Sequence, residues 1–248
     1  MDVNKLLDIA VDAACKAGDF LRERTNLSVE SSEGKDIKLA ADKLSESIII
    51  DVLSSTGIPI LTEESGYLGD KADKFWIIDP LDGSMNYYKG LTDYACVSIA
   101  LWENDEPVLG VINRFSNNEI FTGIKDGKAM LNNKIINTSG IKDIQNAVMA
   151  TGFPVKRDYS DEGLLNFFNQ VRRFKKVRML GSAALMAVYV ACGRVDAYFE
   201  EGIMLWDVAA ALAIIKAAGG EVSCKELGDN RCVVSCFSTS RLMEDFNA

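Results

Sequence analysis

The sequence contains no histidine, only four prolines and no long uninterrupted apolar run. Without histidine there is no imidazole base, no Ser-His-Asp triad and no His-ligated zinc site. Any catalysis must therefore use carboxylates, hydroxyls, thiols, backbone groups or a bound metal. No uncharged run approaches the roughly 20 residues that a membrane-spanning helix needs, so no membrane partner is expected. Asp2, Asp8 and Asp12 interrupt the first apolar residues and argue against a secretory signal, which predicts a cytoplasmic location.

Acidic residues outnumber basic ones by 36 to 27, giving a net charge of −9. Because a phosphate backbone requires a basic face, no nucleic-acid partner is predicted. An anionic small molecule could still bind if a divalent cation reversed the local sign of the potential. The charge of a pocket therefore matters more than the net charge.

Six cysteines lie mostly inside apolar segments. This placement is typical of reduced thiols in a core. An alternative is a metal cluster formed by Cys224, Cys232 and Cys236, although these three lack a CxxC pair and an obvious fourth ligand.

The first half of the chain predicts two helices followed by strands. Apolar residues between Leu6 and Leu21 recur at helical spacing, and this helix ends near Arg24. A polar stretch over 28–36 precedes a second helix, over about 42–53, with its apolar residues on the buried side: Leu44, Ile48, Val52 and Leu53. Strands are expected at 58–61 and 75–78. Further strands at 95–102, 107–113, 119–124 and 128–131, separated by Asn, Asp and Gly turns, predict an antiparallel meander.

The second half alternates strands with helices, which indicates an α/β arrangement. Strands are expected at 148–152, 177–180 and 195–199, and helices at 163–172, 182–191 and 206–218. The fold class is therefore mixed, α/β with α+β, in two subdomains. The N-terminal subdomain spans residues 1–140 and the C-terminal one spans 141–248, with the junction between Asn137 and Asn146.

A pair of aspartates follows the apolar run at 75–78, in the sequence Asp79-Pro80-Leu81-Asp82-Gly83-Ser84. Proline fixes φ and sends the chain into a tight turn, in which the Leu81 carbonyl could join the two carboxylates. Such hard oxygen ligands suit Mg²⁺. Acidic residues are also common turn formers. Here, however, the apolar strand would otherwise point two unpaired charges towards the edge of the core.

Glu63 and Asp207 extend this set of oxygen ligands. Glu63 lies just past a strand end, and Asp207 opens a helix, where it could equally be a first-turn carboxylate favoured by the helix dipole. With the Leu81 carbonyl, the four carboxylates would suit two or three Mg²⁺ ions. Gly83 and Ser84 begin a short expected helix, to about Tyr88, whose free N–H groups could hold a phosphate.

In this order, the motifs resemble those of the inositol monophosphatase family of magnesium-dependent, lithium-sensitive phosphatases, a superfamily that includes fructose-1,6-bisphosphatases. The resemblance covers nearly the whole chain. Its strongest segments are Thr62-Glu63-Glu64-Ser65, Trp76 to Asn86 and Leu205 to Ala210; weaker ones are Ala40-Ala41-Asp42, Gly152-Phe153-Pro154 and Leu180 to Ala184.

The resemblance implies a layered αβαβα sandwich, usually dimeric, with most metal ligands in the first subdomain. It implies metal ligation by Glu63, Asp79, the Leu81 carbonyl, Asp82 and Asp207. Asp42 and Ser84 would form a hydrogen-bonded pair that, with Glu63, serves catalysis. The Gly83 and Ser84 amides, beside Leu81, would hold the phosphate. The alcohol portion of the substrate would face Gly181, Ser182, Ala183 and Glu200.

The implied activity is that of a phosphoric monoester hydrolase, acting on a small polyol or sugar phosphate through a metal-activated water. Alternative substrates are fructose 1,6-bisphosphate, 3′-phosphoadenosine 5′-phosphate, histidinol phosphate or another biosynthetic sugar phosphate. A more remote alternative is a non-catalytic phosphate-binding protein. Met204 stands where some relatives carry a polar residue or histidine, which weighs against inositol itself. Lys156, Arg157 and Arg178 are either solvated charges or contacts for a second anionic group.

Overall fold

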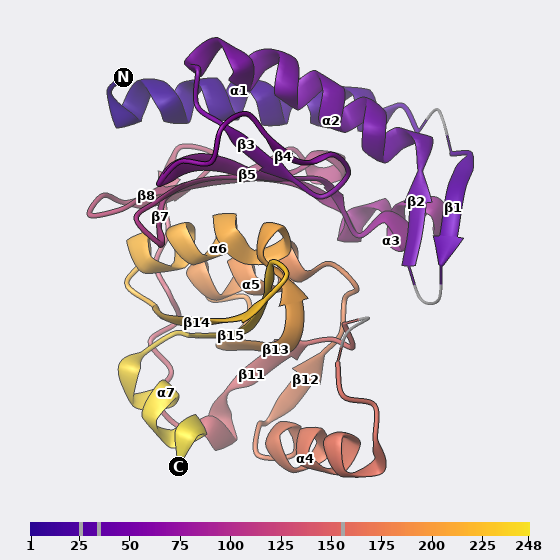
Figure 1. Cartoon of the computed structure of the whole chain (residues 1–248). Coiled ribbons are helices and arrows are strands. Elements are labelled where there is room, and N and C mark those ends of the chain that lie inside the picture. Colours follow the sequence, from indigo (N-terminus) through magenta and orange to yellow (C-terminus); the bar gives the residue numbers. More distant parts are fainter. Residues whose placement is uncertain (25–26, 34–35, 155–156) are drawn as a thin grey trace.

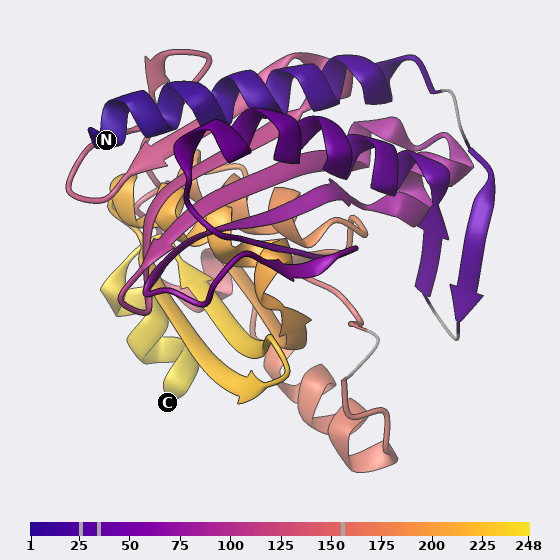
Figure 2. The same cartoon turned by 45° about the horizontal axis from the view of Figure 1, so that its top comes forward.

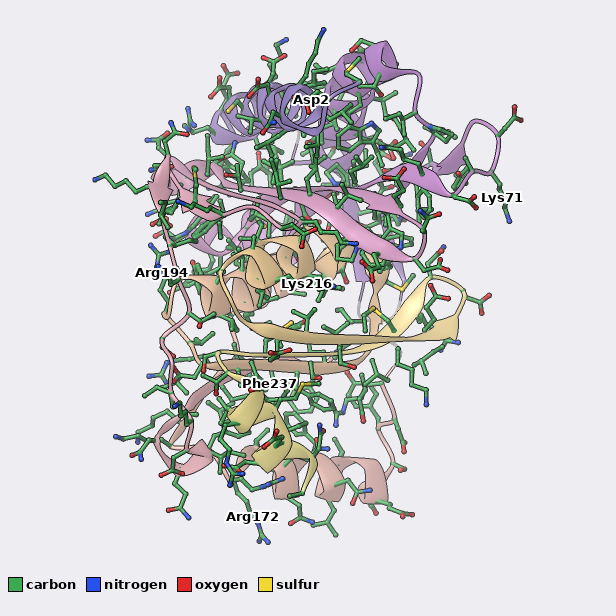
Figure 3. The ribbon with its side chains drawn as sticks, turned by 90° about the vertical axis from the view of Figure 1, so that its left-hand side faces the viewer. Asp2, Lys71, Arg172, Arg194, Lys216 and Phe237 are labelled. Atoms are coloured by element: carbon green, nitrogen blue, oxygen red, sulfur yellow. The ribbon has the colours of Figure 1, made fainter. Side chains whose placement is uncertain are left out.

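The computed structural model describes residues 1–24, 27–33, 36–154 and 157–248. Its helices and sheets alternate in five layers, an αβαβα sandwich (Figure 1). The mixed fold class and the layered architecture predicted from the sequence are confirmed. The helix layers contain, in order, α1 (Val3–Arg22) with α2 (Ala40–Leu53), α5 (Ala183–Ala191) with α6 (Leu205–Ala217), and α4 (Asp161–Val171) with α7 (Ser240–Asn247). Figure 3 shows the stack from the side, with Asp2 in the first layer, Lys216 in the middle helices, Phe237 in the second sheet and Arg172 in the last layer.

The first sheet has eight strands in the order β10-β9-β8-β7-β6-β5-β3-β4. Neighbours from β5 to β10 are antiparallel, so the predicted meander is confirmed, and only β3 and β5 pair in parallel. The strands are β3 (Ile60–Thr62), β4 (Gly66–Leu68), β5 (Lys74–Asp82), β6 (Cys96–Glu103), β7 (Glu106–Arg114), β8 (Glu119–Ile124), β9 (Ala129–Leu131) and β10 (Lys134–Ile135).

The second sheet has five strands in the order β12-β11-β13-β15-β14. The first three are parallel, as the alternation of strands and helices predicts, whereas β15 is antiparallel to both of its neighbours. The hairpin of β14 and β15 and the helix α7 were not predicted. The strands are β11 (Val148–Thr151), β12 (Lys176–Arg178), β13 (Ala197–Met204), β14 (Glu221–Gly228) and β15 (Arg231–Phe237).

Small elements complete the fold. A hairpin of β1 (Val29–Glu33) and β2 (Asp36–Leu39) begins in the predicted polar stretch and extends three residues beyond it, and residues 34–35 lie outside the described part of the chain. The predicted short helix after Gly83 is present as α3 (Ser84–Lys89). The described residues also form the 3₁₀ turns η1 (Ser54–Thr56), η2 (Thr92–Tyr94), η3 (Phe115–Asn117) and η4 (Ile144–Asn146).

The middle helix layer joins the two sheets. α6 packs against β5, β6, β7 and β8 on one side and against β13, β14 and β15 on the other, which explains why it is apolar all round. Its approach to the first sheet is close, because a Cβ added to Gly110 of β7 would lie 2.1 Å from the Ala210 carbonyl oxygen. Along the chain, the last strand of the first sheet ends at Ile135 and the first strand of the second sheet begins at Val148. A division into subdomains between them stays a prediction.

The inner face of α2 differs from the prediction. Leu44 is 43% exposed, and the residues that face the sheet include Asp42, Ser45 and Glu46. The prediction was wrong for Leu44, whereas Leu53 is buried and Ile48 and Val52 pack against the core as predicted. The three polar residues share this inner face because their side chains have hydrogen-bond partners within the protein.

All six cysteines are free thiols. Cys224, Cys232 and Cys236 lie on one face of the β14–β15 hairpin, since their register partners are Val234, Glu226 and Val222. Within the described ranges, no helix is long and apolar enough to cross a bilayer.

Candidate active site

A cavity of about 450 Å³ opens between the two sheets and gathers the predicted site residues. Glu63, Asp79, Asp82 and Asp207 all line it, although they come from widely separated parts of the chain. Among the other residues that line it are Leu81, Gly83, Ser84, Gly181, Ser182, Ala183 and Glu200. The sequence-predicted residues therefore meet in one place, except Asp42, which reaches the cavity wall through Ser84.

A bulge at the end of β5 brings the paired aspartates together. Residues three apart on a regular strand face opposite sides of the sheet. Here Asp79 pairs with Ser98 and Asp82 with Cys96, so Pro80 and Leu81 together oppose a single residue of β6. The extra residue turns both carboxylates towards the cavity. Proline is tolerated there because a bulge leaves one residue without a ladder hydrogen bond, so the N–H that proline lacks is not required.

The two aspartates have different local partners. Asp79 is 1% exposed and accepts one hydrogen bond of 2.9 Å, from the Leu81 amide. Asp82 accepts hydrogen bonds from the start of α5: from the Ser182 hydroxyl, and from the Ala183 and Ala184 amides at 3.2 and 2.8 Å. Asp82 therefore lines the cavity and also fixes α5 to the end of β5.

The carboxylates repel one another across the cavity. Burial raises the pKa of Asp79 well above its ordinary value, and the charges of Glu63, Asp82 and Asp207 raise it further. The pKa of Asp207 is also well above its ordinary value, because of burial first and then the charges of Asp82, Glu63 and Glu200. A cation among these groups would reverse both effects, since it would stabilise the ionised carboxylates.

This donor set fits Mg²⁺. Within the part of the chain that the structure describes, no three acidic or thiol side chains converge tightly enough to define one ion by themselves. Mg²⁺ does not require such a cage, because it keeps several waters and is commonly held by one or two carboxylates and substrate oxygens. Glu63, Asp79, Asp82, Asp207 and the Leu81 carbonyl would hold it.

The predicted Asp42–Ser84 pair is formed. The Ser84 hydroxyl lies 2.8 Å from Asp42 Oδ1 and 2.9 Å from the Leu81 carbonyl oxygen, and its one proton can be donated to only one of them at a time. Burial raises the pKa of Asp42 to about 6, although hydrogen bonds from the Leu39 amide and Ser84 oppose this shift. Asp42 can therefore accept a proton near neutral pH.

At the far end of the cavity, the predicted alcohol-facing residues are brought together. The polar groups of Ser182 and Ala183 are bonded to Asp82, so their contact with a substrate stays a prediction. Glu200 is buried, and burial raises its pKa to about 8, with a further contribution from the charge of Asp82. A protonated Glu200 could donate a hydrogen bond and an ionised one could accept it.

Two of the basic residues considered for a second anionic group, Arg157 and Arg178, are not among the residues that line the cavity. The Arg157 guanidinium is buried over the ring of Phe167, 4.3 Å from its centroid, with Nη2 3.7 Å from Glu201 Oε2. Arg178 is exposed at the end of β12. Lys156 lies outside the described residues.

Sequence reasoning missed two residues beside the site, Ser45 and Glu46. Both contact segments that carry the acidic residues. A signal was present, because they lie three and four positions after Asp42 and therefore on the same face of a helix. Polar residues at that spacing indicate a polar inner face.

A family model described as the inositol monophosphatase family matches residues 2–239. The chain belongs to this family. Membership supports phosphatase activity, and the resemblance stated from the motifs is confirmed.

Similar proteins agree on the fold. The Nus factor SuhB of Xylella fastidiosa (strain Temecula1) is 40% identical over 223 residues, covering 87% of this chain and 80% of the relative. The Nus factor SuhB of Escherichia coli (strain K12) is 38% identical over 232 residues, covering 89% and 85%. Among solved structures, extragenic suppressor protein suhB from Bartonella henselae has a TM-score of 0.87 at 30% identity, covering 98% of this chain and 96% of that one. Inositol monophosphatase from Anabaena (Nostoc) has a TM-score of 0.86 at 32% identity, covering 99% and 95%.

Proposed function

We propose that this protein is a magnesium-dependent phosphomonoesterase that hydrolyses a small polyol or sugar phosphate. The observation that carries the proposal is the meeting of Glu63, Asp79, Asp82 and Asp207 in one cavity, beside the Asp42–Ser84 pair. Phosphoryl transfer asks the protein mainly to position groups and offset charge, and this site has the residues to do both without a histidine.

The chain's own residues divide the work. When bound, Mg²⁺ supplies a Lewis acid that makes water more acidic and offsets the charge of the phosphate. Ser84 takes a proton from the attacking water and passes its own proton to Asp42 Oδ1 over 2.8 Å. Glu63 orients the same water. Leu81, Gly83 and Ser84 place the phosphate, and glycine is needed at 83 because its φ is +87° and an added Cβ would lie 2.5 Å from the Tyr94 carbonyl oxygen.

The alcohol half of the substrate would lie between α5 and β13. Glu200 would bond a hydroxyl group there, and Gly181, Ser182 and Ala183 would form the facing wall. Met204 and Ile203 add apolar surface at this end, which favours an alcohol less polar than inositol.

A phosphate-release assay over a panel of phosphate esters tests the proposal. The panel contains inositol phosphate, fructose 1,6-bisphosphate, 3′-phosphoadenosine 5′-phosphate and histidinol phosphate, each with Mg²⁺ and with a chelator. Mg²⁺-dependent release from one of them is expected and identifies the branch of the superfamily. No release from any compound, with phosphate still bound, would favour a non-catalytic binding protein.

The assembly and the cell compartment are also proposed. The family resemblance favours a homodimer. Six free thiols favour the reducing cytoplasm.

A second role, binding of an acidic macromolecular partner, is suggested by the relatives that are named Nus factors. The exposed residues Arg172, Lys175, Lys176 and Arg178 make a basic edge on an otherwise acidic protein. Such an edge suits an acidic macromolecular partner. A charge-reversed Lys175→Glu, Lys176→Glu variant that keeps phosphatase activity would separate this role from hydrolysis.

A further inference from the structure

The inner face of α2 contacts each segment of the first half that carries a proposed ligand. Asp42 accepts a hydrogen bond from Ser84, two residues after Asp82. Ser45 donates a hydrogen bond of 2.8 Å to the Pro80 carbonyl oxygen, between Asp79 and Leu81. Glu46 contacts the turn after β3, which carries Glu63. α2 lies directly over this edge of the first sheet, where β3 and β5 run side by side (Figures 1 and 2).

Glu46 is buried with three hydrogen-bond donors around its carboxylate. It is only 5% exposed. Its Oε1 accepts from the Thr62 hydroxyl at 2.5 Å and from the Ser65 amide at 3.1 Å, and its Oε2 accepts from the Ser65 hydroxyl at 2.6 Å. A buried carboxylate is costly unless its oxygens are hydrogen-bonded, and here donors from both ends of one turn meet this requirement.

These bonds hold the turn at both ends, and the two residues between them have different surroundings: Glu63 lines the cavity, whereas Glu64 is paired with Lys38, which also lines it. Thr62 pairs with Gly66 across the β3–β4 hairpin, and Gly66 has a positive φ of 73° that closes the turn. Glu64 points to Lys38, with Oε1 3.1 Å from its Nζ. Glu63 lines the cavity, where its charge acts on Asp79 and Asp207. Glu46 itself is not among the cavity-lining residues.

We infer that Glu46 is a positioning residue: it fixes the Thr62–Ser65 turn so that Glu63 faces the other carboxylates, and it thereby sets the affinity of the cavity for divalent cations. This inference rests on the proposed function, because it assigns the cavity to a cation. Residues that orient metal ligands typically alter metal affinity or activity by about 10- to 100-fold when they are removed.

A role in stability alone would have a different signature. Asn113 offers a matched control, because it is also buried and its amide donates a 2.8 Å hydrogen bond to the Ala14 carbonyl oxygen, tying β7 to α1. Its removal costs a buried hydrogen bond away from the cavity-lining residues. Both Glu46→Ala and Asn113→Ala should therefore lower the melting temperature, but only the first should alter cation binding.

Calorimetric titration with Mn²⁺, used as the probe ion, measures the binding directly. Glu46→Ala should bind Mn²⁺ about tenfold more weakly than wild type, and its Mg²⁺ requirement for phosphate release should rise in parallel. Glu46→Gln keeps an acceptor for Thr62 and Ser65, so it should recover most of the affinity. Asn113→Ala should bind as wild type does.

Unchanged Mn²⁺ affinity in Glu46→Ala, with a fall in melting temperature like that of Asn113→Ala, would overturn the inference. If Glu46→Ala does not fold, Ser65→Ala takes its place: weaker Mn²⁺ binding supports the inference, and wild-type binding overturns it. Failure of the proposed function is a separate result, since a wild-type protein that binds Mn²⁺ but releases no phosphate would leave the positioning role measurable.

Discussion

Asp79 is the residue on which the proposed chemistry depends most directly. It is buried, it faces the charges of Glu63, Asp82 and Asp207, and it accepts a hydrogen bond of 2.9 Å from the Leu81 amide. Asp79→Asn keeps an oxygen for that bond but removes the charge. We expect turnover at saturating Mg²⁺ to fall by about two orders of magnitude or more, with the circular dichroism spectrum unchanged.

The control for this variant is Asp70→Asn, since Asp70 is exposed outside the cavity. Asp82→Asn should lose activity too. It should also lower the free energy of unfolding by about 1–3 kcal/mol, because Asp82 accepts the hydrogen bonds that hold α5. Near-normal turnover in Asp79→Asn would remove that aspartate from the site.

Glu200 gives a pH-dependent prediction at the same scale. Its pKa is raised to about 8 in the folded protein by burial, so the folded state favours the protonated form. Its contribution to stability is therefore fully present at pH values below the ordinary glutamate pKa and is lost as pH rises towards 8. With divalent cations chelated, urea unfolding should show wild type losing up to about 4 kcal/mol relative to Glu200→Gln between pH 5 and 8. Parallel pH profiles for the two proteins would contradict the raised pKa.

At the scale of elements, the contact between β7 and α6 is tight enough to test. A Cβ at Gly110 would lie 2.1 Å from the Ala210 carbonyl oxygen, so helix and strand would have to separate. Gly110→Ala should cost about 1–3 kcal/mol or more in urea unfolding.

Gly57→Ala is the comparison for that test. Gly57 has a positive φ of 67° but no atom within 4 Å of an added Cβ, so this change isolates backbone strain. A loss in Gly110→Ala no greater than in Gly57→Ala would show that the contact can relax.

The elements also show what periodicity can and cannot predict. The helix of residues 3–22 and the meander were predictable, because each has one apolar face and recognisable turns. The polar residues on the inner face of α2 were not, because Asp42, Ser45 and Glu46 are buried through partners that lie far away in the sequence. The strands β14 and β15 were not predicted, although polar residues such as Ser223, Lys225 and Ser235 alternate with Cys and Val, which is the pattern of a half-buried strand.

For the whole molecule, the acidic residues of the site were predictable by motif, but their convergence was not deducible from spacing alone. Asp207 lies 125 positions after Asp82, and only the packing of α6 between the sheets brings it to the cavity. The bulge in β5 that turns Asp79 and Asp82 the same way also depends on pairing with β6.

Cation binding should be visible in global stability. Because the proposed Mg²⁺ site exists only in the folded state, Mg²⁺ should stabilise that state by about 2.7 kcal/mol at a concentration 100 times its Kd. We expect a rise in melting temperature with MgCl₂, and a smaller one in Asp79→Asn. Equal shifts with NaCl at matched ionic strength would reduce the effect to screening.

The position of α6 between the two sheets has a consequence for dissecting the protein. A fragment ending near residue 140 would retain Glu63, Asp79 and Asp82 but lose the helices that cover one face of its sheet. That face includes Ile77, Ala100, Ile112 and Phe121, which would then meet water. The halves of this polypeptide are therefore not interchangeable modules: neither can be excised, shuffled or supplied separately without exposing the other's interior.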